Sequence, residues 1–262
     1  MRLGLLAVPA STGLLAALAL AGCTQGGAGS PGSADGGLSG TLTVLAAASL
    51  TETFESLADD FESRHDGVTV QLAFDSSATL AEQVNQGAPA DVLATADERT
   101  MALVAEAGNT ADEPRTFATN RPVLAVPADN PAGIEEFDDI DNDDVEFVVC
   151  VASAPCGALA SAVLDAEGIT NDPASEEVDV KAVLAKVTLD EADAGIVYAT
   201  DARAAGDRVR VVEIPGSAGA LTSYPIAVVG DADEPLLAEA WVDLVLSEPG
   251  QQALRGAGFG AP

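Results

Sequence analysis

Two patterns of apolar residues alternate along the chain. Apolar runs rich in β-branched residues predict buried strands, and apolar residues that recur every three or four positions predict amphipathic helices. Strands are expected at Thr41–Ala46, Val68–Phe74, Asp91–Thr95, Pro122–Val126, Glu146–Val151, Ala194–Tyr198, Arg208–Ile214 and Tyr224–Val229. Helices are expected at Leu50–Phe61, Leu80–Val84, Glu98–Ala107, Gly157–Glu167, Val178–Leu189 and Pro235–Ser247. This alternation predicts an α/β fold with mostly parallel sheets.

Length and composition indicate a globular chain with two lobes. The chain has 262 residues, of which 48% are apolar and 20% charged, so it can bury a real core and is neither disordered nor fibrous. The part that follows Gly40 is long enough to favour two α/β lobes over one.

The charge balance excludes one class of partner. Lys and Arg number 11 against 42 Asp and Glu, a formal charge of −31, so a nucleic-acid-binding surface is excluded. Such a charge also repels anions at long range, and a bound anion would need a local, desolvated site. The acidic segment Glu135–Asp144 is expected to be a solvated surface turn. Calcium binding is the alternative, but the glycine-centred EF-hand spacing is absent.

The N-terminus has the pattern of a signal peptide. A Met-Arg start precedes the apolar run 3–20, and Leu20-Ala21-Gly22-Cys23 resembles a bacterial lipobox. The resemblance implies that residues 1–22 are cleaved and that Cys23 carries a lipid anchor outside the cytoplasm. Residues 23–40 then form a flexible tether rich in glycine and serine. An uncleaved membrane helix is the alternative, but proline and glycine interrupt a run already short for spanning.

Two further cysteines, Cys150 and Cys156, lie six residues apart in an expected oxidising compartment. They form a disulfide if the chain turns between them, and otherwise they are two unpaired thiols. A metal site has little support, because His65 is the only histidine. The same scarcity leaves no Ser-His-Asp triad, and no G-x-S-x-G or phosphate-loop motif is present. The sequence therefore predicts no enzyme.

Serines occupy two strand-to-helix corners. Ser49 and Glu52 have the spacing of a capping box, and Ser76 and Ser77 follow the second strand. Each serine is by itself expected only to cap a helix. Together the two corners indicate a binding site, because neighbouring parallel strands bring two helix N-termini to one sheet edge. Unpaired N–H groups, helix dipoles and hydroxyls there would bind a small oxyanion without any basic side chain.

Four ordered motifs resemble the molybdate-binding proteins of bacterial ABC importers. The motifs are Ala46-Ala47-Ala48-Ser49-Leu50, Ser76-Ser77-Ala78-Thr79-Leu80-Ala81, Gly87-Ala88-Pro89-Ala90-Asp91 and Gly195-Ile196-Val197-Tyr198. The resemblance implies a type II periplasmic-binding fold, two α/β lobes joined by crossing strands. One lobe would be residues 41–119 with 224–262, and the other residues 120–223.

The resemblance also implies a set of ligand contacts. Ser49 and Ser77 match two serines that donate through hydroxyl and backbone N–H groups, and Tyr198 matches a tyrosine that donates through its hydroxyl. Cys156 and Val180 fall at positions that donate through backbone N–H groups. Cys156 departs from the usual alanine, which is tolerable if its thiol is tied to Cys150. Asp75 also departs from the usual small residue, and its carboxylate is expected to face away from the ligand.

The implied function is a monomeric, lipid-anchored binding protein. It would capture molybdate or tungstate, with no cofactor and no covalent chemistry, and deliver it to an ABC permease with its ATPase. Sulfate or phosphate is the alternative ligand. Ferric ion is disfavoured, because iron-binding relatives use paired tyrosines and this chain has only Tyr198 and Tyr224. A lipoprotein enzyme and a surface adhesion or scaffold protein are alternatives from other classes.

Overall fold

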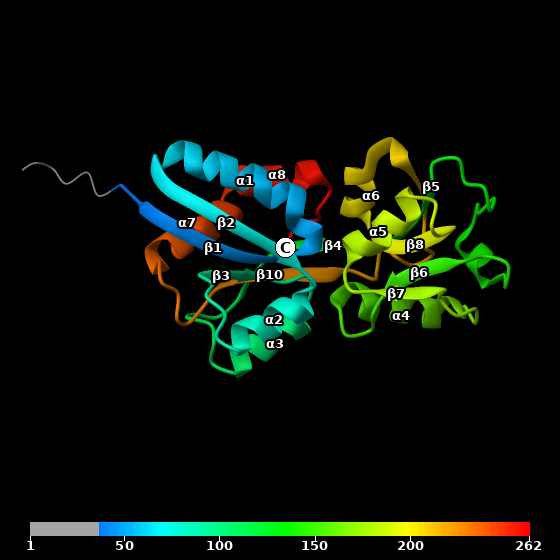
Figure 1. Cartoon of the computed structure of the whole chain (residues 1–262), viewed down its shortest axis with the longest axis horizontal. Helices are drawn as coiled ribbons and strands as arrows, with labels where there is room; N and C mark the ends of the chain where they lie inside the picture. Colours follow the sequence, from blue (N-terminus) through cyan, green and yellow to red (C-terminus); the bar gives the residue numbers. More distant parts are fainter. Residues whose placement is uncertain (1–36) are drawn as a thin grey trace, which may run out of the picture. The chain divides into compact units, whose positions relative to one another are not determined.

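The computed structural model describes residues 37–262, which contain two five-stranded sheets (Figure 1). The first has the order β2-β1-β3-β10-β4: β1 Ser39–Ala47, β2 Gly67–Asp75, β3 Val92–Ala94, β4 Arg115–Asn120, β10 Thr222–Val228. The second has the order β7-β6-β8-β5-β9: β5 Pro122–Pro127, β6 Phe147–Cys150, β7 Ser175–Glu177, β8 Ala194–Tyr198, β9 Val209–Val212. The signal-peptide prediction and Cys23 lie outside the described residues.

Helices cover both faces of each sheet (Figure 1). We call the first sheet and its helices the first lobe: α1 Thr51–Arg64, α2 Ser77–Asn85, α3 Glu98–Glu106, α7 Pro235–Leu246 and α8 Glu248–Ala257. We call the second sheet and its helices the second lobe: α4 Pro155–Glu167, α5 Val180–Thr188 and α6 Ala199–Ala205. Short 3-10 helices are η1 Ala48–Leu50, η2 Phe137–Asp141 and η3 Gly206–Arg208. The two-lobed α/β architecture predicted from the sequence is confirmed.

Both sheets are mixed rather than mostly parallel. In the first lobe β1 pairs in parallel with β2 and β3, whereas β10 runs antiparallel to β3 and β4. In the second lobe β6 pairs in parallel with β7 and β8, whereas β5 runs antiparallel to β8 and β9. The antiparallel strands are those that carry the chain from one lobe to the other, and their direction is set by that crossing.

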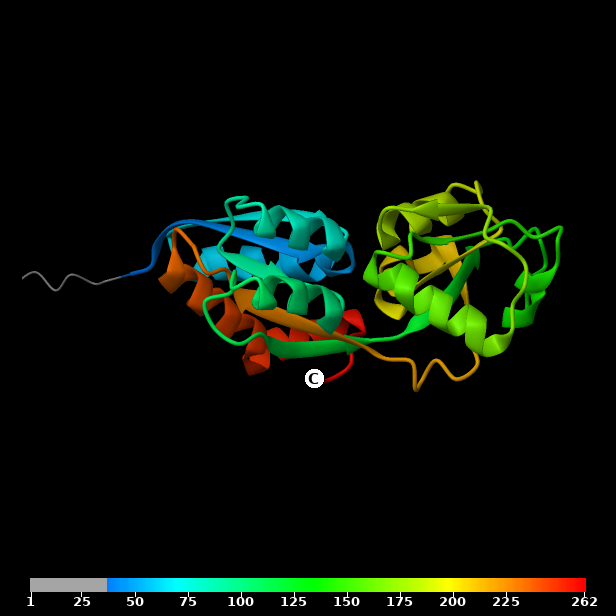
Figure 2. The same cartoon turned by 90° about the horizontal axis from the view of Figure 1, so that it is seen from below.

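Two segments connect the lobes (Figure 2). Only Arg121 separates β4 of the first lobe from β5 of the second, and the chain returns through residues 213–221 between β9 and β10. The Arg121 guanidinium joins these segments through two contacts with Glu213, of 2.5 Å from Nη1 and 3.1 Å from Nη2. The ranges 41–119 with 224–262 and 120–223 stay the proposed division of the lobes, although Asn120, Thr222 and Ser223 belong to strands of the first sheet.

The core of the first lobe is built by α1 and α7 against the sheet. The ring of Trp241 packs at right angles on Phe54 and Phe61, with centroid separations of 5.5 Å and 5.7 Å. The helical spacing of apolar residues in α1 predicted this buried face. By contrast, α6 and α8 were not predicted: α6 has only seven residues, and α8 contains Pro249, Gly250 and Gly256.

The acidic segment 135–144 is more ordered than a solvated turn. Two of its own residues, Phe137 and Ile140, are buried, and η2 begins with a capping box. The Asp141 carboxylate accepts N–H bonds from Thr170 and Asn171, which lower the pKa of this acid. Within residues 37–262 no group of three or more His, Cys, Asp or Glu side chains is arranged to hold a metal ion. In that same part of the chain, every helix is too short or too polar to cross a bilayer.

Candidate functional site

A small cavity lies between the two lobes, at the carboxyl ends of their parallel strands. All five ligand contacts expected from the resemblance line it. The lining residues are Ala47, Ala48, Ser49, Asp75, Ser76, Ser77, Ala96, Pro155, Cys156, Asp179, Val180 and Tyr198. The space between atoms in the cavity is about 210 Å³, part of it open to solvent, so only a ligand of a few atoms can be enclosed there. Its size therefore suits a small ion.

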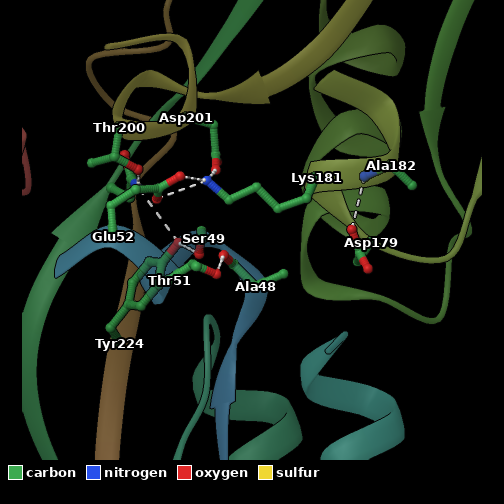
Figure 3. Close-up of polar contacts among 11 residues, drawn as sticks. Ala48, Ser49, Thr51, Glu52, Asp179, Lys181, Ala182, Thr200, Asp201 and Tyr224 are labelled. Atoms are coloured by element: carbon green, nitrogen blue, oxygen red, sulfur yellow. Dashed lines mark hydrogen bonds and ion pairs between the residues drawn. The ribbon is translucent and has the colours of Figure 1, made fainter. Parts of the chain in front are cut away.

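The register of the first sheet brings the two serine corners together. Parallel pairing of β1 with β2 sets Ala47 opposite Asp75, so the segments that follow both strands start side by side. Ser49 lies in η1 and is buried, and its Oγ lies 2.8 Å from the Tyr224 hydroxyl (Figure 3). The predicted capping box is therefore wrong: α1 has no side-chain cap, because the Ser49 hydroxyl bonds to Tyr224 instead.

Ser77 does not act as a helix cap either. It is the first residue of α2, it is 1% exposed, and its Oγ accepts the Ala96 N–H at 2.9 Å. Ser76 is the N-cap residue, without a side-chain bond to the helix. Because the Ser77 oxygen is used as an acceptor, its hydroxyl hydrogen is left to donate toward the cavity.

The second lobe supplies the N-terminus of α4. Cys150 ends β6 and Cys156 is the second residue of α4, and a disulfide joins them. Helix and strand approach so closely here that a Cβ on Gly157 would lie 2.0 Å from the Val151 carbonyl oxygen. The first-turn amides of α4, which have no partner within the helix, are thereby held at the cavity.

Helix α5 supplies another N-terminus. Asp179 caps it by accepting the Ala182 N–H at 2.9 Å, which leaves Val180 as the first helical residue at the cavity wall. The sequence placed the helix start two residues earlier, at Val178, and the aspartate cap explains the difference.

Tyr198, at the end of β8, is buried, and its hydroxyl has no hydrogen-bond partner within the described residues. An unpaired buried hydroxyl costs free energy unless a ligand uses it. Burial raises the pKa of Tyr198 well above its ordinary value, so the phenol stays protonated and available as a donor. Tyr224 packs edge-on at a centroid separation of 6.0 Å.

The electrostatics of the cavity come from backbone and hydroxyl groups. The N-termini of η1–α1, α2, α4 and α5 meet at its wall, and each contributes partial positive charge. No lysine or arginine from residues 37–262 lines it. The lining is not made of donors alone, however. Asp75 is part of the cavity wall, and its Oδ1 accepts the Ser76 N–H at 2.6 Å, which is the local capping contact expected for this carboxylate.

Two polar contacts cross between the lobes at the margins of the cavity. Lys181 of α5 reaches Glu52 of α1, with Nζ at 2.7 Å and 2.8 Å from the two carboxylate oxygens (Figure 3). The Arg99 guanidinium of α3 donates to the Ser153 carbonyl at 3.0 Å. The cavity is therefore described in a state in which the lobes touch.

Sequence reasoning missed the residues that support the site from behind. Tyr224 bonds to Ser49 across 175 positions, and Asn120 donates to Thr200 at 2.8 Å and to the Tyr224 hydroxyl at 3.4 Å. No local pattern marks such long-range pairs. The Asp179 cap was detectable, since Asp before an apolar helical pattern is a common helix start.

The fold and the cavity define a class of protein. The family model described as "bacterial extracellular solute-binding protein" matches residues 42–260, and the chain belongs to this family. The molybdate-binding protein ModA of Mycobacterium tuberculosis is 40% identical over 255 residues, 96% of this chain and 98% of its own.

Solved structures show the same fold. The periplasmic molybdate-binding protein of Azotobacter vinelandii aligns with a TM-score of 0.76 at 20% identity, covering 84% of this chain and 99% of its own. The sulfate-binding protein SubI of Mycobacterium tuberculosis aligns with a TM-score of 0.73 at 20% identity, covering 84% of this chain and 86% of its own.

Proposed function

We propose that the protein binds molybdate, and tungstate as its close chemical analogue, in the cavity between the lobes. One observation carries the proposal: four helix N-termini and the unpartnered hydroxyl of Tyr198 meet in a cavity sized for an inorganic ion. The relative that is 40% identical over nearly its whole length is a molybdate-binding protein, which supports the choice of anion.

Neutral donors are sufficient for such a ligand. A tetrahedral dianion that has left water needs a hydrogen bond at each oxygen, and backbone N–H groups together with the hydroxyls of Ser49, Ser77 and Tyr198 provide them. The ligand contacts proposed here are those three residues with the backbone N–H groups of Cys156 and Val180. Binding is a closure of the lobes on the ion and involves no covalent step.

A protonated oxyanion is the second candidate, because two acidic residues belong to the cavity wall. Asp75 and Asp179 line it, and a free carboxylate oxygen would accept the proton of hydrogen phosphate but repel a full dianion. Each already accepts a backbone N–H, from Ser76 and Ala182, which favours a local structural role. Ferric ion stays disfavoured, since burial raises the pKa of both Tyr198 and Tyr224 and opposes the phenolate form.

Calorimetry of the purified protein with molybdate, tungstate, sulfate and phosphate tests the ligand. We expect tight 1:1 binding of molybdate and tungstate and weak or undetectable binding of the other two. Tight binding of sulfate or phosphate with none of molybdate would overturn the assignment.

The cellular role follows from the class of protein and from the N-terminus. We propose that Cys23 is lipidated, that the protein is held outside the cytoplasm at the cell membrane, and that it delivers its ion as a monomer to an ABC permease with its ATPase. Replacement of Cys23 by serine is expected to abolish lipid labelling. Labelling that persists in Cys23→Ser would refute the anchor.

A further inference from the structure

Three ionisable side chains form a cluster that spans the two lobes. Lys181 Nζ lies 2.7 Å from Glu52 Oε1 and 3.1 Å from Asp201 Oδ1 (Figure 3). Glu52 belongs to α1 in the first lobe, whereas Lys181 and Asp201 belong to α5 and α6 in the second. Only the pair between Glu52 and Lys181 therefore joins the lobes.

The ion pair of Lys181 with Asp201 is more buried than its ion pair with Glu52, and the two pairs have different roles. The Asp201 side chain is 0% exposed, Lys181 is 26% exposed and Glu52 is 54% exposed. A buried carboxylate requires its cation, so the pair with Asp201 holds the Lys181 ammonium at the surface of the second lobe. When the lobes separate, that pair can persist, and the ammonium loses only Glu52.

Each member of the cluster follows a proposed ligand contact by one to three positions in the sequence. Glu52 follows Ser49 by three positions at the start of α1, Lys181 directly follows Val180 on α5, and Asp201 follows Tyr198 by three positions on α6. The cluster thus ties together the segments that carry three of the five donors. It does not line the cavity itself.

We propose that Glu52, Lys181 and Asp201 form an ionic latch that holds the lobes closed around the bound anion and slows its release. The three are positioning residues: they act through the relative placement of η1–α1, α5 and β8–α6. The latch rests on the proposed function, because it acts on an anion bound in the cavity.

The direction in which Glu52→Gln changes anion affinity distinguishes the latch from a long-range effect of charge. Glu52→Gln removes a negative charge near an anion site, and through the long-range field alone this change strengthens anion binding or leaves it unaltered. Loss of the latch has the opposite sign. We expect Glu52→Gln to weaken molybdate binding about three- to tenfold, mainly through faster dissociation.

The chain offers matched controls for both partners. Glu55→Gln removes the same charge from the same helix at an exposed position that forms no ion pair within residues 37–262. Lys186 pairs with Glu177 at 2.6 Å inside the second lobe, so Lys186→Gln removes an ion pair that does not cross the cavity. Both controls should leave the dissociation rate of molybdate unchanged.

The experiment is a double-mutant cycle on dissociation rates measured by stopped flow. Lys181→Gln should also accelerate release, and Glu52→Gln combined with Lys181→Gln should add little to the single changes. Because Lys181→Gln strands the buried Asp201 and can impair folding, Glu52→Gln is the deciding variant. Unchanged or slower release from Glu52→Gln, or additive effects of the two changes, would overturn the latch.

A second readout separates failure of the latch from failure of the proposed function. Small-angle X-ray scattering of wild type and Glu52→Gln, with and without molybdate, reports how closed the lobes are. If wild type binds none of the four oxyanions, the proposed function fails, and the latch is judged on the unliganded proteins. A more open Glu52→Gln then supports the claim that the ion pair closes the lobes, and identical scattering overturns it.

Discussion

Tyr198 and Ser77 both line the cavity, but their hydroxyls differ in the hydrogen bonds that they form within the protein. The Tyr198 hydroxyl is unpartnered among the described residues, whereas the Ser77 oxygen accepts the Ala96 N–H. Removing each hydroxyl therefore gives a different balance of affinity and stability.

Tyr198→Phe should weaken molybdate binding by about 1.5–3 kcal/mol, the usual worth of a hydrogen bond to a charged group, and leave the free energy of unfolding equal or higher. Calorimetry and denaturant unfolding measure the two quantities. Tyr224→Phe is the control, because its hydroxyl bonds to Ser49 and its loss should lower stability. Unaltered affinity in Tyr198→Phe would remove this residue from the site.

Ser77→Ala should reduce both quantities. The ligand loses a donor, worth about 1–3 kcal/mol, and the buried Ala96 N–H loses its acceptor at a similar cost in unfolding free energy. A variant with full affinity and reduced stability would restrict Ser77 to a structural role.

Asp201 makes stability depend on pH in an unusual direction. Burial raises the pKa of this carboxyl from 3.8 to about 6, opposed by Lys181. Between these two values the unfolded chain binds fewer protons than the folded one, so the contribution of Asp201 falls as pH rises.

The test is Asp201→Asn. Its unfolding free energy relative to wild type should increase by about 2 kcal/mol between pH 4 and pH 7, as calculated from the two pKa values. Urea titrations at several pH values measure it. A constant difference across that range would show that Asp201 titrates normally.

At the scale of elements, the site is the meeting of strand ends and helix starts. The apolar periodicity of α1 and the β-branched runs of β1 and β2 are local signals, and they predicted these elements and the nearness of Ser49 to Ser77. The wrong capping box has a physical reason, since Tyr224 competes for the Ser49 hydroxyl from 175 residues away. The crossing direction of β10 likewise depends on tertiary contacts that no local pattern encodes.

The disulfide fixes one of these helix starts. Replacing Cys150 and Cys156 together by serine should lower the unfolding free energy by about 2 kcal/mol, from the entropy of a short closed loop. It should also weaken molybdate binding, because the first-turn amides of α4 lose their anchor to β6. Thermal unfolding and calorimetry on the oxidised protein and the double variant test both effects. Loss of stability with unchanged affinity would show that α4 is held by packing alone.

For the whole molecule, binding and stability are linked. A ligand at about 100 times its dissociation constant adds roughly 2.7 kcal/mol to the unfolding free energy. Molybdate should therefore raise the melting temperature, and sulfate at equal ionic strength should not. The formal charge of −31 makes this salt control necessary, since ions also screen self-repulsion. No stabilisation by any oxyanion would favour an adhesion or scaffold role.

The aromatic packing of the first lobe has a practical consequence. The chain has one tryptophan, Trp241, and it is fully enclosed by α1 and the sheet, with Phe54 and Phe61 as neighbours and no place in the cavity wall. Its ultraviolet emission should shift only when the lobe that contains it melts. Tryptophan fluorescence thus reports unfolding of the first lobe, and in the folded protein it does not respond to the ion in the cavity.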